Sequence, residues 1–257
     1  MNYVFGKEVT IFGDSITKGM YFDGLKPQKI QNSFVEILQK EGNLSITNNS
    51  VFGQTLKRVY EKGIIQTYAL QNDVDNRVCV IALGGNDSDY NWLEVQNGSA
   101  ITYAPKTSLE EFSFMLENLV EILKEKNIIP ILCSLCPVDS NRYFDNVLAK
   151  KFDGTKILEF LHGDKQNIYR YQELYNNEII KLAMKTNTIF FDYRKEFLKR
   201  ADYTQLMCLD GIHPNEQGHK LIAEFAQKFM EEKQSSALFS IFAHNNIKIQ
   251  QNTQKNG

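Results

Sequence analysis

Residues 78–83, Val-Cys-Val-Ile-Ala-Leu, form a continuous apolar run with no polar residue in alternation. A strand that is apolar on both faces has to be covered on both faces, as a central strand is in a parallel sheet flanked by helices. The run ends at Gly84-Gly85-Asn86-Asp87, which are residues typical of a turn. We therefore expect a buried strand whose carboxyl end carries glycines and polar side chains.

Four further strands are expected from similar apolar or β-branched runs, at residues 9–12, 44–51, 128–135 and 188–192. Helical spacing of apolar residues predicts helices at 33–40, 56–60, 108–126, 171–182 and 215–230. The third of these begins with Ser108 and Glu111, the two residues of a capping box. Strands that alternate with helices predict a three-layer α/β/α sandwich around a mostly parallel five-stranded sheet.

Two stretches, 88–107 and 139–168, lack a clear period. We expect the first to be a loop insertion and the second to be an irregular cover over one sheet edge, with surface decoration as the alternative. Apolar area for such a cover would come from Tyr143, Phe144, Phe152, Phe160 and Leu161. Four cations in it could hold polar or anionic parts of a substrate, namely Arg142, Lys150, Lys151 and Lys156.

The domain is expected to span residues 1–233, followed by a polar tail at 234–257 that contains one apolar run, 237–243.

Composition narrows the function classes. The 257 residues are 42% hydrophobic and 23% charged, with a formal net charge of −2 and no basic stripe, so neither nucleic acid nor a membrane surface is an expected partner. The first residues lack a leader pattern and no apolar run reaches 18 residues, which favours a cytoplasmic protein. The four cysteines suit a reducing compartment, and for Cys133 and Cys136 ordinary burial is favoured over a redox or metal pair.

The first strand ends at Gly13-Asp14-Ser15. In an open α/β sheet, ligands bind at the carboxyl ends of the strands, where loop amides favour developing negative charge. A serine hydroxyl at that place could be a nucleophile. The alternative is that Asp14 and Ser15 only cap a helix, as such pairs often do.

A second polar group, Asp210-Gly211-Ile212-His213-Pro214, precedes the last expected helix. An acid three residues before a histidine can hold imidazole Nδ1 while Nε2 points elsewhere, which is how an acid orients a general base. A lone histidine of this kind is more often a surface residue. However, we expect this group to lie at the same sheet edge as Ser15, Gly53 and the turn at residues 84–87.

At this point the sequence resembles the SGNH hydrolases, the GDSL-type lipase and esterase family. Four blocks match in order: Gly13-Asp14-Ser15-Ile16, Gly53, Gly84-x-Asn86-Asp87 and Asp210-x-x-His213. The resemblance covers residues 8 to 230 and implies a flavodoxin-like fold. It further implies that Ser15 is the nucleophile, His213 the general base and Asp210 its orienting acid. The backbone amides of Ser15 and Gly53 and the side chain of Asn86 would form the oxyanion hole.

The expected function is that of a serine esterase acting on short-chain acyl esters, acetyl groups on carbohydrates among them, with a small-molecule ester as partner. No metal or cofactor is expected. No Gly-x-Ser-x-Gly, Gly-x-Gly-x-x-Gly or Walker A pattern points to an α/β-hydrolase elbow or to a nucleotide. The alternative function is a non-catalytic binding module for carbohydrate or another small ligand. The oligomeric state stays unknown at this level.

Overall fold

A computed structural model describes residues 8–22, 26–42, 44–71, 77–98 and 104–233. Its centre is a sheet of five strands in the order β4 (Ser45–Asn48), β1 (Glu8–Gly13), β5 (Val78–Ala82), β6 (Ile129–Cys133) and β7 (Ile189–Phe191). All four neighbouring pairs are parallel. Numbered along the chain, these strands follow the 2-1-3-4-5 order of doubly wound flavodoxin-like sheets. The predicted five-stranded α/β fold is confirmed.

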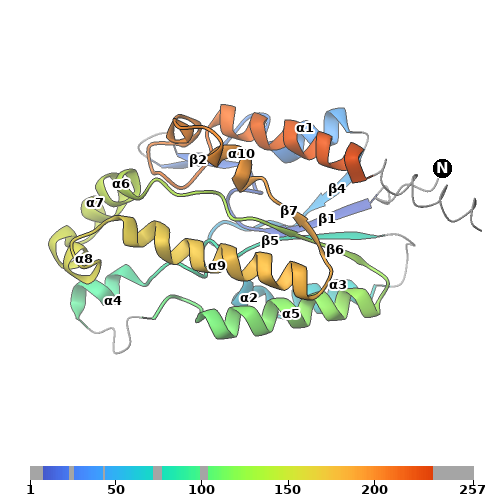
Figure 1. Ribbon diagram of the computed structural model, residues 1–257, viewed down its shortest axis with the longest axis horizontal. Helices are drawn as coiled ribbons and strands as arrows, with labels where there is room; N and C mark the ends of the chain where they lie inside the picture. Colours follow the sequence, from blue (N-terminus) through green and yellow to red (C-terminus); the bar gives the residue numbers. More distant parts are fainter. Residues whose placement is uncertain (1–7, 23–25, 43, 72–76, 99–103, 234–257) are drawn as a thin grey trace, which may run out of the picture.

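Helices cover both faces of the sheet (Figure 1). One face packs against α2 (Leu56–Glu61), α3 (Ile64–Ala69), α5 (Leu109–Glu125) and α9 (Gln166–Lys185). The other packs against α1 (Phe34–Glu41), α10 (Arg194–Leu198), the 3₁₀ turn η2 (Tyr203–Leu206) and a helix over residues 216–233. Two buried apolar clusters, one on each side of the sheet, hold the three layers together.

The predicted helix at residues 108–126 is present as α5, and its capping box forms as the sequence indicated. Ser108 accepts a hydrogen bond from the Glu111 amide, and the Glu111 carboxylate accepts one from the Ser108 amide. The structure also contains a small antiparallel hairpin, β2 (Met20–Phe22) and β3 (Pro27–Lys29), between β1 and α1. Strands of three residues are too short to show an alternating pattern, so no local pattern predicts this hairpin.

The segments expected to be irregular contain helices, and that part of the prediction was wrong. Residues 88–98 include α4 (Trp92–Asn97), and residues 139–168 include α6 (Ser140–Tyr143), the π-helical turn η1 (Phe144–Leu148), α7 (Ala149–Lys151) and α8 (Gly154–Phe160). Helices of one or two turns hold too few residues to show a 3.6-residue period. The predicted tail, residues 234–257, lies outside the described residues.

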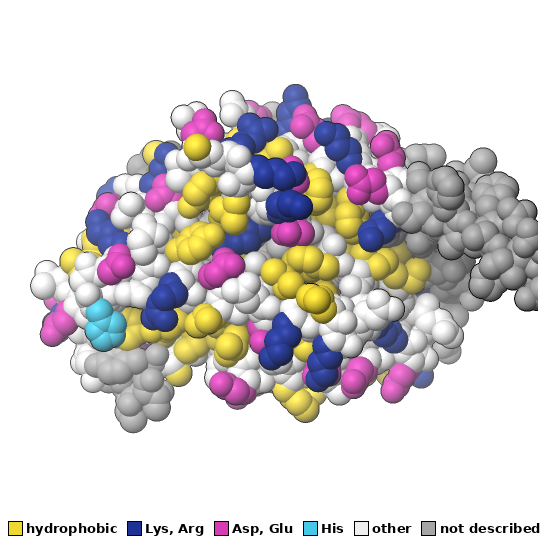
Figure 2. Space-filling model, viewed as in Figure 1, with side chains coloured by type: hydrophobic (Ala, Val, Ile, Leu, Met, Phe, Trp, Pro, Cys, Tyr) yellow, Lys and Arg dark blue, Asp and Glu magenta, His cyan; other side chains and the backbone are white. Residues whose placement is uncertain are grey.

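These short helices gather at one end of the sheet, where the strands end (Figure 1). They share a third apolar cluster with the start of α9, and Tyr90 lies in it with its ring centroid 5.0 Å from those of Phe160 and Tyr171. We call this cluster and the helices that build it the cap. On the face shown in Figure 2, Lys and Arg side chains are interspersed with Asp and Glu.

Candidate active site

Ser15 lies directly beyond the carboxyl end of β1. The turn that carries it is fixed by a hydrogen bond from the Ile16 amide to Asp14 Oδ1 (2.9 Å) and another from the Met20 amide to the Ser15 carbonyl (2.9 Å). A side chain at Gly13 would collide with the Thr17 hydroxyl, so glycine is required there. No helix starts at this turn. Asp14 and Ser15 therefore do not serve as a helix cap, which was the alternative interpretation of the motif.

His213 and Asp210 reach Ser15 from the far end of the chain. His213 Nε2 lies 2.8 Å from Ser15 Oγ, and His213 Nδ1 lies 2.6 Å from Asp210 Oδ2. All three side chains are more than nine-tenths buried. A proton on Nδ1, donated to the carboxylate, leaves Nε2 free to accept the Ser15 hydroxyl proton.

The loop that carries Asp210 and His213 is held tightly. Asp210 Oδ1 accepts hydrogen bonds from the backbone amides of Ile212 (3.0 Å) and His213 (3.1 Å). Gly211 has φ +71°, and a side chain there would collide with the Asp139 carbonyl oxygen at the start of the cap. The Asp139 amide in turn donates to the Gly211 carbonyl (2.8 Å). The acid and the histidine are thus positioned by backbone contacts as well as by each other.

Of the described residues expected to form an oxyanion hole, Ser15 and Asn86 line the cavity and Gly53 does not. Asn86 follows β5 and lines the same cavity as Ser15, and its Nδ2 donates to the Gln54 carbonyl (3.0 Å). A side-chain amide has two N–H groups, so this contact leaves one donor over. Gly53 is not among the described residues that line the cavity. It lies with φ +68° in the turn that Asn86 holds.

Asp87 is a buried residue beside the site whose role was not predicted. Its side chain is fully buried and accepts hydrogen bonds from the amides of Leu56 (2.8 Å) and Lys57 (3.3 Å) and from the Thr107 hydroxyl (2.7 Å). Burial raises the pKa of Asp87. Asn86 and Asp87 together fasten the loop after β5 to the loop after β4. The partners are distant in sequence, so no local pattern could have revealed this role.

Asp14 is a second carboxyl group in the cavity wall. Burial raises its pKa from 3.8 to about 6, against the opposing effects of the Ile16 amide and of His213. The sequence singled out Asp14 only as part of the turn. A carboxyl group whose charge changes near pH 6 therefore lies next to Ser15.

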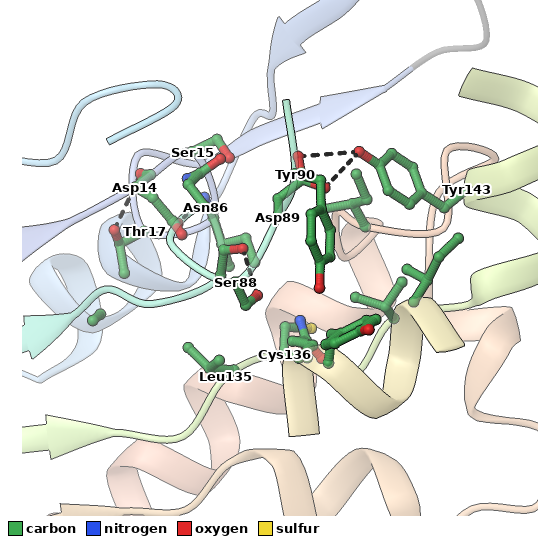
Figure 3. Close-up of a pocket in the computed structure, with 18 of the residues that line it drawn as sticks. Asp14, Ser15, Thr17, Asn86, Ser88, Asp89, Tyr90, Leu135, Cys136 and Tyr143 are labelled. Carbon is green, nitrogen blue, oxygen red and sulfur yellow. Dashed lines mark hydrogen bonds between the residues drawn. The ribbon is translucent and has the colours of Figure 1, made fainter. Parts of the chain in front are cut away.

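The cavity extends from Ser15 and Asn86 toward the ends of β6 and β7 and has a volume of about 90 Å³ (Figure 3). The lining includes four aromatic side chains from the cap and α9, namely Tyr90, Trp92, Tyr143 and Tyr171. In Figure 3 the Tyr143 hydroxyl contacts both carboxylate oxygens of Asp89 (3.3 Å each). Leu135 and Cys136, which follow β6, also line the cavity. Polar side chains, Asp14, Thr17 and Asn86, lie next to Ser15, and the apolar and aromatic part of the lining lies farther from it (Figure 3).

The expected cover does border the cavity, through Tyr143 and Ile168, but its four cations do not. None of Arg142, Lys150, Lys151 or Lys156 is among the described residues of the lining. Arg142 instead donates to the Thr204 carbonyl (2.6 Å) and pairs with Asp139 (3.2 Å). The prediction that these cations face a substrate therefore gains no support from the cavity.

Residues 11–221 match the model of the GDSL-like lipase/acylhydrolase family. The chain belongs to this family. The match includes all five residues expected in the site, and it makes the protein a carboxylic ester hydrolase by family. Among curated proteins none matches the chain.

Solved structures of similar fold agree with the family. LAE5, an α/β hydrolase from the metagenome of Lake Arreo, is 18% identical with a TM-score of 0.60, over 90% of this chain and 98% of its own. Axe2, an acetylxylan esterase from Geobacillus stearothermophilus, is 20% identical with a TM-score of 0.59, over 90% and 96%. A G-D-S-L family lipolytic protein from Veillonella parvula is 19% identical with a TM-score of 0.58, over 86% and 96%. At these identities the likeness concerns the fold.

Two further features are the state of the cysteines and the character of the helices. Cys133 and Cys136 are buried and unpaired, and burial raises the pKa of the Cys133 thiol to about 12. Within the part of the chain that the structure describes, no helix combines the length and apolar character that crossing a bilayer demands.

Proposed function

We propose that the protein is a serine esterase that hydrolyses short-chain acyl esters through an acyl-enzyme formed on Ser15. The observation that carries the proposal is the continuous contact from Ser15 Oγ through the His213 imidazole to Asp210, at 2.8 and 2.6 Å, at the mouth of a cavity. A serine hydroxyl is a weak nucleophile until a positioned base removes its proton. This arrangement provides that base and the acid that orients it.

In the proposed reaction, His213 Nε2 takes the proton of Ser15 as Oγ attacks the ester carbonyl carbon. The former carbonyl oxygen becomes negative and is stabilised by the amides of Ser15 and Gly53 and by Asn86 Nδ2. The imidazolium, held by Asp210, then gives its proton to the leaving alcohol oxygen. A water molecule, activated by the same imidazole, releases the acid and restores Ser15.

The cavity supports a short acyl group. Its volume of about 90 Å³ is smaller than the roughly 150 Å³ of an apolar cavity that holds one benzene molecule. Acetyl to butyryl groups suit this volume, whereas an octanoyl chain exceeds it. We therefore expect acetate esters to be better substrates than octanoate esters. Acetyl groups on carbohydrate are included in the proposal, supported by the similar fold of the acetylxylan esterase Axe2.

The test is hydrolysis of p-nitrophenyl acetate together with covalent labelling by a fluorophosphonate probe. The native protein should hydrolyse the ester and gain the mass of one probe at Ser15. Ser15→Ala should do neither, with a loss in kcat of several orders of magnitude, on the order of 10⁶. Ser45→Ala, a change on exposed β4, is the matched control and should retain both. An intact mass that the probe leaves unchanged, in a protein that is still active, would refute the acyl-enzyme.

We also propose a cytoplasmic location. All four cysteines are buried and unpaired, and unpaired thiols persist in reducing compartments. Cell fractionation with an antibody against the protein tests this proposal, and recovery outside the cytoplasmic fraction would contradict it.

A further inference from the structure

The rim of the site carries two exposed apolar side chains that the proposed reaction does not use. Val51 and Phe52 are 41% and 47% exposed, whereas Ser50 and Gln54 on either side are buried. Single exposed apolar residues are ordinary on a protein surface. Phe52, however, lies on the His213 imidazole, with ring centroids 6.2 Å apart and planes inclined by 17°. A half-exposed aromatic ring thus lies nearly parallel to the His213 imidazole and beside it.

The turn that carries Phe52 is fixed at both ends. The Val51 amide donates to the Gly13 carbonyl (3.1 Å), the Gln54 amide donates to the Val51 carbonyl (3.1 Å), and Asn86 holds the Gln54 carbonyl. The exposure of Phe52 is therefore a property of an anchored turn. An apolar ring held in water beside a catalytic base needs an explanation beyond packing.

The geometry of ester cleavage assigns the sides of the site. The leaving oxygen has to come within hydrogen-bond distance of His213 Nε2 to receive its proton. The carbonyl oxygen faces Asn86, and the acyl group enters the cavity, which is lined by Ser15 and Asn86 but by neither His213 nor Phe52 among the described residues. The alcohol part of the ester is then left on the side of His213, where Phe52 lies.

We propose that Phe52 is a binding platform for the alcohol part of the substrate, and that this alcohol is a ring with a flat C–H face. The inference rests on the proposed esterase function. A rigid ring that lies flat on Phe52 loses less conformational freedom on binding than a flexible chain of the same size does, an advantage equivalent to roughly 3- to 10-fold in affinity. An alicyclic alcohol and a pyranose sugar both present such a face.

The experiment compares acetate esters of three primary alcohols, so that the acyl group is constant and the leaving groups are alike. These are cyclohexylmethyl acetate, n-heptyl acetate and glucose 6-acetate. In Phe52→Ala the ratio of kcat/KM for the cyclohexylmethyl ester to that for the heptyl ester should fall roughly 3- to 10-fold, because the rigid ring loses the surface on which it lies flat. Phe52→Trp, which keeps an aromatic face, should preserve the ratio. So should Phe114→Ala, which removes a 65% exposed phenylalanine from α5.

The sugar ester distinguishes the source of the ring. If kcat/KM for glucose 6-acetate, relative to the heptyl ester, falls in Phe52→Ala as it does for the cyclohexylmethyl ester, the alcohol is a sugar. If the relative kcat/KM falls for the cyclohexylmethyl ester alone, the alcohol is an apolar ring. An equal fall for the cyclohexylmethyl and heptyl esters would overturn the platform, because it would mean that Phe52 only positions His213. An unchanged ratio with unchanged rates would overturn it as well.

Failure of the proposed function gives a different result. If the native protein hydrolyses none of the three esters, the esterase proposal fails, and binding alone tests the platform. Saturation-transfer NMR titrations of cyclohexylmethanol and n-heptanol would then compare Ser15→Ala with the double variant Ser15→Ala/Phe52→Ala. A preference for the ring alcohol that disappears with Phe52 supports the platform. A preference that survives in the double variant, or one that is absent from both proteins, overturns it.

Discussion

At the scale of single residues, the side-chain amide of Asn86 has two N–H groups. One donates to the Gln54 carbonyl, and on the proposed mechanism the other donates to the oxyanion. We predict that Asn86→Ala lowers kcat by roughly 10²- to 10³-fold with little change in KM, because the lost donor acts mainly in the transition state. Steady-state kinetics with p-nitrophenyl acetate measure both constants. A raised KM at unchanged kcat would make Asn86 a ground-state binding residue instead.

Asp14 gives a prediction for the dependence of stability on pH. Because burial raises its pKa from 3.8 to about 6, the folded protein binds this proton more tightly than the unfolded chain does. The contribution of Asp14 to the free energy of unfolding therefore falls as the pH rises from about 4 to 6, by at most about 3 kcal/mol, and is constant above that range. An asparagine at this position carries no charge, so Asp14→Asn should not show this fall in the free energy of unfolding between pH 4 and 6.

The measurement is urea unfolding of the native protein and Asp14→Asn at pH 4, 5, 6 and 7. Relative to the native protein, the variant should gain stability between pH 4 and 6. Asp202→Asn, at an exposed aspartate, serves as the control and should show no such trend. If the difference between the native protein and Asp14→Asn is the same at every pH, the carboxyl group does not titrate as its burial indicates.

At the scale of elements, α6 of the cap is joined to the loop that carries Asp210. Arg142 Nη1 donates to the carbonyls of Thr204 (2.6 Å) and Met207 (3.2 Å), just ahead of that loop. Removing the guanidinium removes these hydrogen bonds, so the backbone from Thr204 to Asp210 is held less rigidly. We predict that Arg142→Ala lowers kcat by roughly 10- to 100-fold through misplacement of His213, with Arg142→Lys intermediate.

The rate of fluorophosphonate labelling of Ser15 should fall with kcat, since both depend on the His213 base. Thermal unfolding of the same variants measures the structural cost separately. An Arg142→Ala protein that is less stable but labels and turns over at the native rate would show that Arg142 supports the fold alone.

How far the sequence predicts each element depends on element length. The 17-residue helix α5 shows its period and its capping box, the runs of β5 and β6 are apolar throughout, and residues 9–12 of β1 are β-branched or aromatic, so the sheet and its carboxyl edge could be predicted. The short helices of the cap could not be predicted. At the site, local motifs identified Ser15, Asp210 and His213, and the structure brings them together. The role of Asp87 depends on the Leu56 amide and Thr107, partners that no local motif contains.

At the scale of the whole molecule, α9 belongs to both the cap and the main core. It contributes Ile168 to the cap cluster and Tyr175 and Ile179 to the cluster beneath the sheet. A continuous helix that is buried in both should make the two unfold together. The single tryptophan, Trp92, lies 6% exposed in the cap and reports on it alone.

We predict that Trp92 fluorescence and far-UV circular dichroism show the same midpoint in urea. A fluorescence change that precedes the loss of helical signal would mean that the cap opens as a separate unit. In that case access to the cavity would be governed by the cap and not by the stability of the whole domain.

Ser15 and His213 are 198 residues apart, one after β1 and the other before the helix over residues 216–233. At roughly 5 to 20 residues per second of translation, the ribosome adds the histidine about 10 to 40 s after the serine. On the proposed assignment, a growing chain therefore carries its nucleophile without a base. On the same assignment, hydrolytic activity begins only after residue 213 has been added and the chain has folded, and a translation product that stops before Asp210 should not hydrolyse esters.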